Sequence, residues 1–518
     1  MSEEATAAID VTEMSKRDGG RAYPPQTIPA LARLLDDLAD RGVRFCHWKS
    51  NEHLAAGLAG RTDLDLLVDT DQIDAFRELL RQHGVKELTA PPSKRFPGME
   101  HALGFDPDTG SLFHLHVHRQ LVLGEEHVKN HHVPLEDAFL GSSRELDGVP
   151  VPSPELELAV LAVRALLKYR GRDGVKDVLT IRTPGLDRMR PELEWLLART
   201  TIERVGSILR STGDVVPSDL VVRFLRTYRR DMRAGVAFLL LRGRLRSSLR
   251  ALRRSGRARV RMRRIVLGCR RRLAPAPRMT FAATAPTIAL VGADGSGKST
   301  SARALAGWLG WKVDVRVHYL GSKSPSLRSR WSYVAFRALR RGHRAATGKT
   351  GSGSARARAL EAMRDLALGA HYLAIGHDRA RRVLAGRRDA RSGRLVIFDR
   401  FPLMALSERE DHLVLDGPRI RTSLRPGGGL ISSLADREER LYRRFGLPDR
   451  LLVLEVSPHV ASGRKPDHVP QILAAKSRAA RELADMAERS HVPVVRIDAD
   501  RPLDEVLLDL KRSLWDGA

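Results

Sequence analysis

The sequence predicts an α/β protein with two domains and a basic helical connector. Over residues 284–518, short apolar runs alternate with helical stretches, which predicts a parallel sheet covered by helices on both faces. Residues 25–212 combine an amphipathic helical pattern with alternating strand patterns, which predicts an α+β domain. An arginine-rich block, residues 213–283, separates the two. With 518 residues the chain is too long for one hydrophobic core, which agrees with this division.

The composition favours a cytoplasmic protein. Residues 1–24 are polar and include acidic side chains, so they predict a disordered start rather than a signal peptide. No apolar run has the length needed to span a bilayer. Cys46 and Cys269 are the two cysteines, and their wide separation indicates neither a disulfide framework nor a zinc site built from cysteines.

The formal net charge of +27 is concentrated in one segment. Residues 223–278 contain twenty arginines, no lysine and one acid, Asp231. This pattern fits a helix that lies peripherally on an anionic membrane surface at the inner face, and it equally fits a solvated connector. Nucleic acid is the weaker partner, because aromatic residues for base stacking are sparse there. The sequence does not specify the oligomeric state.

A glycine-rich loop follows the apolar run at residues 287–291. The pattern is Gly292, four residues, then Gly297, Lys298 and Ser299, and it precedes a helical stretch. Its glycines let backbone N–H groups turn toward phosphates, Lys298 can reach the β- and γ-phosphates, and Ser299 can ligate Mg²⁺. The predicted ATP-binding residues are Gly292, Ala293, Asp294, Gly295, Ser296, Gly297, Lys298, Ser299 and Thr300.

A second polar motif follows a later strand pattern, residues 395–398. Asp399 and Arg400 come directly after that run, and further strand patterns occupy residues 451–456 and 492–497. Ligands of parallel sheets bind beyond the carboxyl ends of the strands. We therefore expect Asp399 to hold Mg²⁺ or its water and Arg400 to bind a phosphate, the alternative being a structural ion pair.

Together these motifs resemble the thymidylate kinase family. The resemblance rests on residues 292–300, Asp399-Arg400-Phe401, Pro448-Asp449 and the segment Gly463-Arg464-Lys465-Pro466. It implies a P-loop kinase domain that uses ATP and Mg²⁺ to phosphorylate a nucleoside monophosphate, dTMP-like, or a related phosphorylated acceptor. It also implies catalytic roles for Lys298, Asp399, Arg400 and Arg464, with Asp294 and Arg400 binding the acceptor.

Residues 321–393 depart from that family, because this stretch is longer and more basic than the usual acceptor region. The acceptor therefore stays open. The runs Asp399-Arg400-Phe401-Pro402 and Asp416-Gly417-Pro418 resemble a divergent branch of the family that is associated with bacterial surface-polysaccharide genes.

The N-terminal domain has its own acidic motif. An amphipathic helix pattern at residues 27–40 and a strand pattern at 44–48 come before Asp63 and Asp65, which alternate with apolar residues. Both carboxylates then project from one face of a strand, at a spacing that suits Mg²⁺. This arrangement resembles the nucleotidyltransferase superfamily, although Lys49-Ser50 replaces the expected Gly-Ser.

The third acid of that superfamily is not evident. The matching strand pattern, residues 112–118, carries His114, His116 and His118 on its polar face, and imidazole is a poor ligand for Mg²⁺. Several interpretations remain: a degenerate domain that binds a nucleotide or sugar phosphate, an active variant using another acid such as Asp106, a transition-metal site, or a packed histidine face without a ligand.

The function expected from the sequence is ATP- and Mg²⁺-dependent phosphoryl transfer by the C-terminal domain. Two alternatives stay open. One is a non-catalytic ATP-binding switch that controls the N-terminal domain or the basic segment. The other is a bifunctional kinase and nucleotidyltransferase linked to surface-polysaccharide synthesis.

Overall fold

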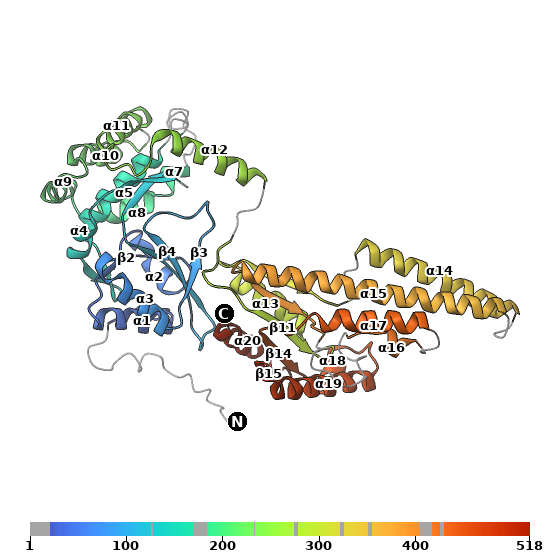
Figure 1. The fold of residues 1–518 in the computed structure, drawn as a ribbon. Helices are drawn as coiled ribbons and strands as arrows, with labels where there is room; N and C mark the ends of the chain where they lie inside the picture. Colours follow the sequence, from blue (N-terminus) through green and yellow to red (C-terminus); the bar gives the residue numbers. More distant parts are fainter. Residues whose placement is uncertain are drawn as a thin grey trace, which may run out of the picture. The chain divides into compact units, whose positions relative to one another are not determined.

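The computed structural model describes residues 21–518 apart from 126–127, 170–172, 174–183, 233, 274–277, 322–325, 351–354, 403–416, 425–428 and 518. The chain forms two compact units, Met1–Pro277 and Arg278–Ala518. Figure 1 shows the fold of each unit.

A parallel five-stranded sheet forms the centre of the C-terminal unit. Its strand order is β12-β13-β11-β14-β15, and each neighbouring pair is parallel. The strands are β11 (Thr287–Gly292), β12 (Val315–Tyr319), β13 (Leu395–Asp399), β14 (Arg450–Glu455) and β15 (Val494–Asp498). Because β11 pairs with β13 on one side and β14 on the other, the chain order reverses at β11. Crevices at such a reversal are the usual ligand sites of parallel sheets.

Helices cover this sheet on both faces, as the sequence predicts. Ala289 and Val291 of β11 share a core with Val383 and Ala480, which belong to α15 (Ala355–Arg391) and α19 (Pro470–Arg489). On the opposite face, α13 (Lys298–Leu309) and α20 (Leu503–Gly517) contact each other and the strands. The two-sided cover explains the uninterrupted apolar runs at residues 288–291, 395–398 and 451–454 in the three inner strands.

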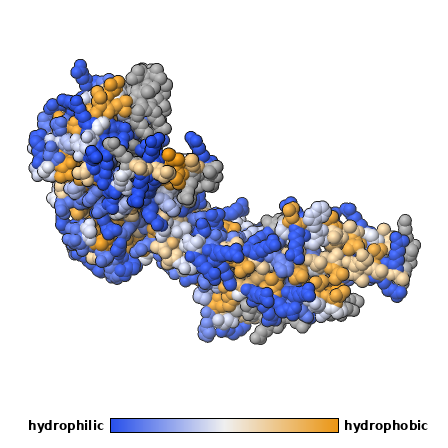
Figure 2. Space-filling view, turned by 45° about the horizontal axis from the view of Figure 1, so that its top comes forward, coloured by the Kyte–Doolittle hydropathy of each residue, from blue (hydrophilic) through white to orange (hydrophobic). Residues whose placement is uncertain are grey.

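A long helical arm occupies much of the basic stretch 321–393. It consists of α14 (Leu327–Thr350) packed along α15, and α17 (Gly429–Arg443) also packs against α15 (Figure 1). Hydrophobic surface is visible on the arm (Figure 2). The exposed large apolar side chains of α14 and α15 include Trp331, Val334 and Met363. The short helices α16 (Ile420–Ser423) and α18 (Pro458–Arg464) and the two-residue strand β10 (Thr280–Phe281) also belong to this unit.

In the N-terminal unit, the sheet has the strand order β1-β2-β5-β4-β3. Its strands are β1 (Phe45–His47), β2 (Leu64–Val68), β3 (Lys86–Thr89), β4 (Met99–Phe105) and β5 (Leu112–His118). The pair β2–β5 is parallel, whereas β1–β2, β3–β4 and β4–β5 are antiparallel. The helices α1 (Pro29–Asp40) and α3 (Ile73–Gln82) pack on one face of the sheet, against apolar residues such as Leu66 and Leu115.

A second, mainly helical part of this unit packs around α5 (Pro154–Lys168). Further elements of the unit are η1 (Asn51–His53), α2 (Leu54–Leu58), η2 (Thr70–Gln72), β6 (Val122–Glu125), β7 (Val128–His132), α4 (Glu136–Gly141), β8 (Arg144–Leu146), β9 (Val149–Val151), α7 (Pro184–Asp187), α8 (Arg190–Leu197) and α9 (Ile202–Ser211).

The arginine-rich block differs from the expected separate connector. Its first helices, α10 (Ser218–Arg230) and α11 (Gly235–Ser248), pack against α5 and bury Phe224 and Phe238 in the same core. The N-terminal unit therefore extends through most of residues 213–283. The following helix, α12 (Arg257–Leu273), exposes Met262 and Ile265. Among the described residues, no helix has the length and apolar character needed to cross a membrane.

The predicted disordered start falls largely outside the described part of the chain, which begins at residue 21. Within residues 21–24, the Tyr23 hydroxyl donates a hydrogen bond of 2.8 Å to Asp36. This end of the predicted disordered segment is therefore attached to α1.

Glu157 gives the N-terminal unit a testable pH dependence. Burial raises the pKa of this carboxyl, which accepts hydrogen bonds from Asn51, to about 7 from the ordinary 4.5. Between these two pH values the folded protein keeps a proton that the unfolded chain has lost. The free energy of unfolding should therefore fall by up to about 3 kcal/mol as the pH rises from 4.5 to 7.

We expect Glu157→Gln to remove this dependence, because the amide does not titrate. Urea unfolding of both proteins across that pH range measures the effect. If the difference in the free energy of unfolding between the natural protein and Glu157→Gln stayed constant from pH 4.5 to 7, the raised pKa of Glu157 would be contradicted.

Candidate functional site

The glycine-rich loop at residues 292–297 joins β11 to α13 at the point where the sheet order reverses. Gly292, Gly295 and Gly297 all have positive φ, at 154°, 91° and 87°. A Cβ on Gly292 would lie 2.5 Å from the carbonyl oxygen of Leu454, and one on Gly295 would lie 3.1 Å from that of Ala461. Both the backbone conformation and the close neighbours therefore require glycine.

Lys298 places a positive charge inside this loop. It is the first residue of α13 and is 6% exposed. Its ammonium donates hydrogen bonds to the carbonyl of Gly292 at 2.7 Å, to that of Ala293, and to the Ser296 hydroxyl at 3.4 Å. The positive end of the helix dipole adds to this charge. The loop is thus suited chemically to an anion.

Ser299 and Asp399, the predicted Mg²⁺ ligands, come together. The Ser299 hydroxyl donates a hydrogen bond of 2.7 Å to Oδ2 of Asp399, which is the last residue of β13. Asp399 is 4% exposed, and its Oδ1 accepts no hydrogen bond from the described residues. A buried carboxylate oxygen without a partner is costly, and a divalent cation would satisfy it. The Ser299 hydroxyl and the Asp399 carboxylate are therefore chemically suited to ligate one cation.

Arg400 faces the loop through Asp294. Its guanidinium donates a hydrogen bond of 2.8 Å to Asp294, and the Lys476 ammonium of α19 binds the other carboxylate oxygen. Burial alone would raise the pKa of Asp294, but Lys476 and Arg400 hold that pKa well below its ordinary value. Arg400 has a φ of 66°, a conformation that is uncommon for residues other than glycine. Such backbone strain is frequent at functional sites.

Arg464 lies at the rim of the loop. Its guanidinium donates hydrogen bonds to the carbonyls of Ala499, at 2.8 Å, and Gly295, at 3.4 Å. Thr300, the last predicted loop residue, is exposed on α13.

Asp449 lies away from the loop, at the opposite end of β11. Its carboxylate accepts hydrogen bonds of 2.7 Å from the backbone N–H and from the hydroxyl of Thr287. Asp449 therefore has a structural role.

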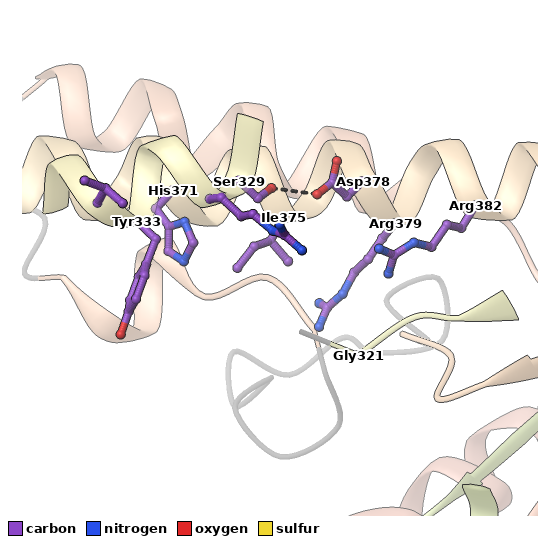
Figure 3. A pocket seen from close by; sticks show the side chains of 10 residues that line it. Gly321, Ser329, Tyr333, His371, Ile375, Asp378, Arg379 and Arg382 are labelled. Atoms are coloured by element: carbon purple, nitrogen blue, oxygen red, sulfur yellow. Dashed lines mark hydrogen bonds between the residues drawn. The ribbon is translucent and has the colours of Figure 1, made fainter. Parts of the chain in front are cut away.

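A cavity of about 460 Å³ lies where α14 and α15 begin to extend beyond the sheet (Figure 3). Gly321 follows β12, whose last residue, Tyr319, is paired with Asp399. The cavity therefore opens near the same carboxyl edge of the sheet as Asp399. Its lining residues are Gly321, Ser329, Arg330, Tyr333, Val334, His371, Ile375, Asp378, Arg379 and Arg382.

Aromatic rings and arginines define the chemistry of this cavity. The rings of Tyr333 and His371 lie 5.3 Å apart. Arg379 is 2% exposed and donates a hydrogen bond of 2.6 Å to the carbonyl of Leu320, and Arg382 donates one of 2.8 Å to that of Tyr319. The carboxylate of Asp378 is held by the Ser329 hydroxyl at 2.6 Å. Such a lining suits a ring-containing molecule with negative charge.

Sequence reasoning missed Lys476 and the cavity residues. Lys476 is one basic residue on a helix with several others, and Arg379 belongs to a stretch in which arginines recur. Neither position is marked by a local motif. A signal was present only in the unusual length of residues 321–393.

The acidic pair of the N-terminal unit is occupied by basic side chains. Lys49 lies 2.8 Å from Oδ1 of Asp65, and ring nitrogens of His116 and His118 lie 3.2 and 3.1 Å from the same oxygen. Burial would raise the pKa of Asp65, but Lys49 and the two histidines hold that pKa well below its ordinary value. Asp63 contacts Nδ1 of His114 at 2.9 Å. This arrangement does not favour Mg²⁺ between the two carboxylates.

Asp106, the alternative third acid, has a structural role. It is fully buried and accepts hydrogen bonds from the backbone N–H of Ala30 at 3.1 Å and from the Thr109 hydroxyl at 2.7 Å. Its carboxylate thus fixes the start of α1 and a turn between strands.

No model of a known protein family matches the chain, and no curated protein sequence matches it.

The loop geometry predicts opposite effects for two glycine substitutions. Gly292→Ala should lower the free energy of unfolding of the C-terminal unit by about 1–3 kcal/mol, because its Cβ meets the Leu454 carbonyl. Gly307→Ala is the matched control: it lies within α13 with nothing within 4 Å of the new Cβ, so it should be stabilising by about 0.5–1 kcal/mol. Chemical denaturation measures both. Equal stability of the two variants would contradict the loop geometry.

Proposed function

We propose that the C-terminal unit is a phosphotransferase of P-loop kinase type that uses ATP and Mg²⁺ to phosphorylate a phosphorylated acceptor, a nucleoside monophosphate or a related molecule. The observation that carries this proposal is the hydrogen bond between Ser299 and Asp399, next to the buried Oδ1 of Asp399. It joins the glycine-rich loop to the end of β13 at one cation-binding position.

In this proposal the nucleotide phosphates lie in the loop at residues 292–299. Backbone N–H groups and the α13 N-terminus bind the phosphate oxygens. When the nucleotide binds, the Lys298 ammonium gives up its hydrogen bonds to the loop carbonyls and binds the β- and γ-phosphates instead. Mg²⁺ is held by Ser299 and by Asp399, directly or through water. Phosphoryl transfer needs positioned cations around the transferred group more than covalent catalysis, and these residues supply them.

Arg400 and Asp294 act on the acceptor side. Arg400 reaches the loop through its contact with Asp294, so its guanidinium is close to where the transferred group would lie. We propose that it binds the acceptor phosphate, since a planar guanidinium suits two phosphate oxygens. Arg464, at the loop rim, adds positive charge on the nucleotide side.

The cavity between α14 and α15 is the proposed acceptor pocket. Tyr333 and His371 can stack against a planar or cyclic group, and Arg379 and Arg382 provide positive charge near the strand ends. These features support an acceptor that carries both a ring and a phosphate. They also favour a transferase over an ATP-binding switch, because a switch needs no second pocket.

The proposal predicts a large loss of activity when the loop lysine is removed. Lys298→Ala and Asp399→Asn should lower kcat at least about 100-fold, because each removes charge stabilisation of the transferred phosphoryl group or its metal. The assay measures ATP consumption with a panel of nucleoside monophosphates and sugar phosphates. Lys312→Ala is the control, since Lys312 contacts Trp311 away from the loop.

Arg400→Ala separates acceptor binding from nucleotide binding: KM for the acceptor should rise more than KM for ATP. Turnover by Lys298→Ala equal to that of the natural sequence would overturn the proposed function.

A further inference from the structure

Three histidines converge on the face of the N-terminal sheet that points away from α1 and α3. His101 on β4 is the cross-strand partner of His116 on β5, and His114 precedes His116 by two residues on the same strand. One ring nitrogen from each histidine can be chosen so that all three lie within 4.8 Å of one another. This spacing is compatible with three ligands of a single metal ion.

His101 is buried without a polar partner. It is 5% exposed, and neither of its ring nitrogens makes a hydrogen bond with the described residues. Its neighbours are imidazole rings: His114 is stacked on it at 5.4 Å and His116 meets it edge-on at 4.8 Å. A buried polar group left unsatisfied is costly, and a metal ion bound to the ring would satisfy one nitrogen.

The two carboxylates of β2 lie behind the other two rings. Oδ1 of Asp63 is 2.9 Å from Nδ1 of His114, and Oδ1 of Asp65 is 3.2 Å from Nδ1 of His116. A carboxylate at Nδ1 favours the tautomer that carries the proton there and the lone pair on Nε2. Carboxylates in this position typically orient histidine ligands of zinc and increase their basicity.

We propose that His101, His114 and His116 bind one Zn²⁺ ion through their imidazoles, with Asp63 and Asp65 orienting two of the rings. Imidazole donors favour Zn²⁺ over Mg²⁺ or Ca²⁺, which take oxygen ligands. Oδ2 of Asp63 lies 3.5 Å from Nε2 of His116, so this carboxylate could supply a fourth ligand. Water or an added anion can take that position instead. This site is separate from the Mg²⁺ position proposed at Asp399.

Metal analysis of the full-length, untagged protein tests the proposal. After incubation with Zn²⁺ and dialysis, mass spectrometry of the metal should find about one Zn²⁺ per chain. His101→Gln and His116→Gln should each reduce zinc affinity about 100-fold, because each removes one of three ligands. His83→Gln is the matched control, since His83 contacts Asp37 elsewhere in the same unit and should leave zinc binding unchanged.

A second readout covers variants that fold poorly. Co²⁺ bound to the natural sequence should show visible absorption of a four- or five-coordinate ion without a thiolate band, and Zn²⁺ should raise its melting temperature. No zinc bound by the folded natural sequence would overturn the proposal. So would zinc binding equally tight in the folded His101→Gln or His116→Gln protein, or a Co²⁺ spectrum of six-coordinate type.

Discussion

The hydrogen bond between Ser299 and Asp399 is the interaction on which the site in the C-terminal unit depends. The loop positions Ser299, which is the second residue of α13. The sheet positions Asp399, which is the last residue of β13, the strand paired with β11. The order of the strands places these two positions together. Neither the loop nor the β13 end would form a cation site alone.

Charge balance around the loop follows from the same topology. Lys298 lies inside the loop, while Arg400 and Lys476 reach it from β13 and α19 through Asp294. One carboxylate therefore holds two cations from different elements at the loop. A polyphosphate with its metal would bring the negative charge that this cluster of cations can bind.

The sequence predicts those parts of the molecule that a local pattern encodes. The strands, the loop and the Asp399-Arg400 pair are short contiguous motifs, and the structure brings the pair next to the loop. Lys476 and Arg379 could not be predicted, because their proximity to the site depends on how long helices pack. The separate connector was a misleading expectation, since Phe224 and Phe238 lie among arginines but pack into the N-terminal core.

The histidine cluster of the N-terminal unit could also be predicted only in part from the sequence. The alternation of His114, His116 and His118 identifies one polar strand face, but His101 stands alone on β4 and joins them only through strand register. Likewise, the Asp63 and Asp65 motif suggests Mg²⁺ until the contact of Lys49 with Asp65 is seen. Cross-strand contacts of this kind leave no mark in the local sequence.

The most direct test of the central claim is ATP affinity with and without Mg²⁺ in a double-mutant cycle of Ser299→Ala and Asp399→Asn. If the two residues hold one metal ion, Mg²⁺ should strengthen ATP binding about tenfold or more in the natural sequence, each substitution should abolish most of that gain, and the two effects should not add. An equal gain from Mg²⁺ in all four proteins would contradict the account.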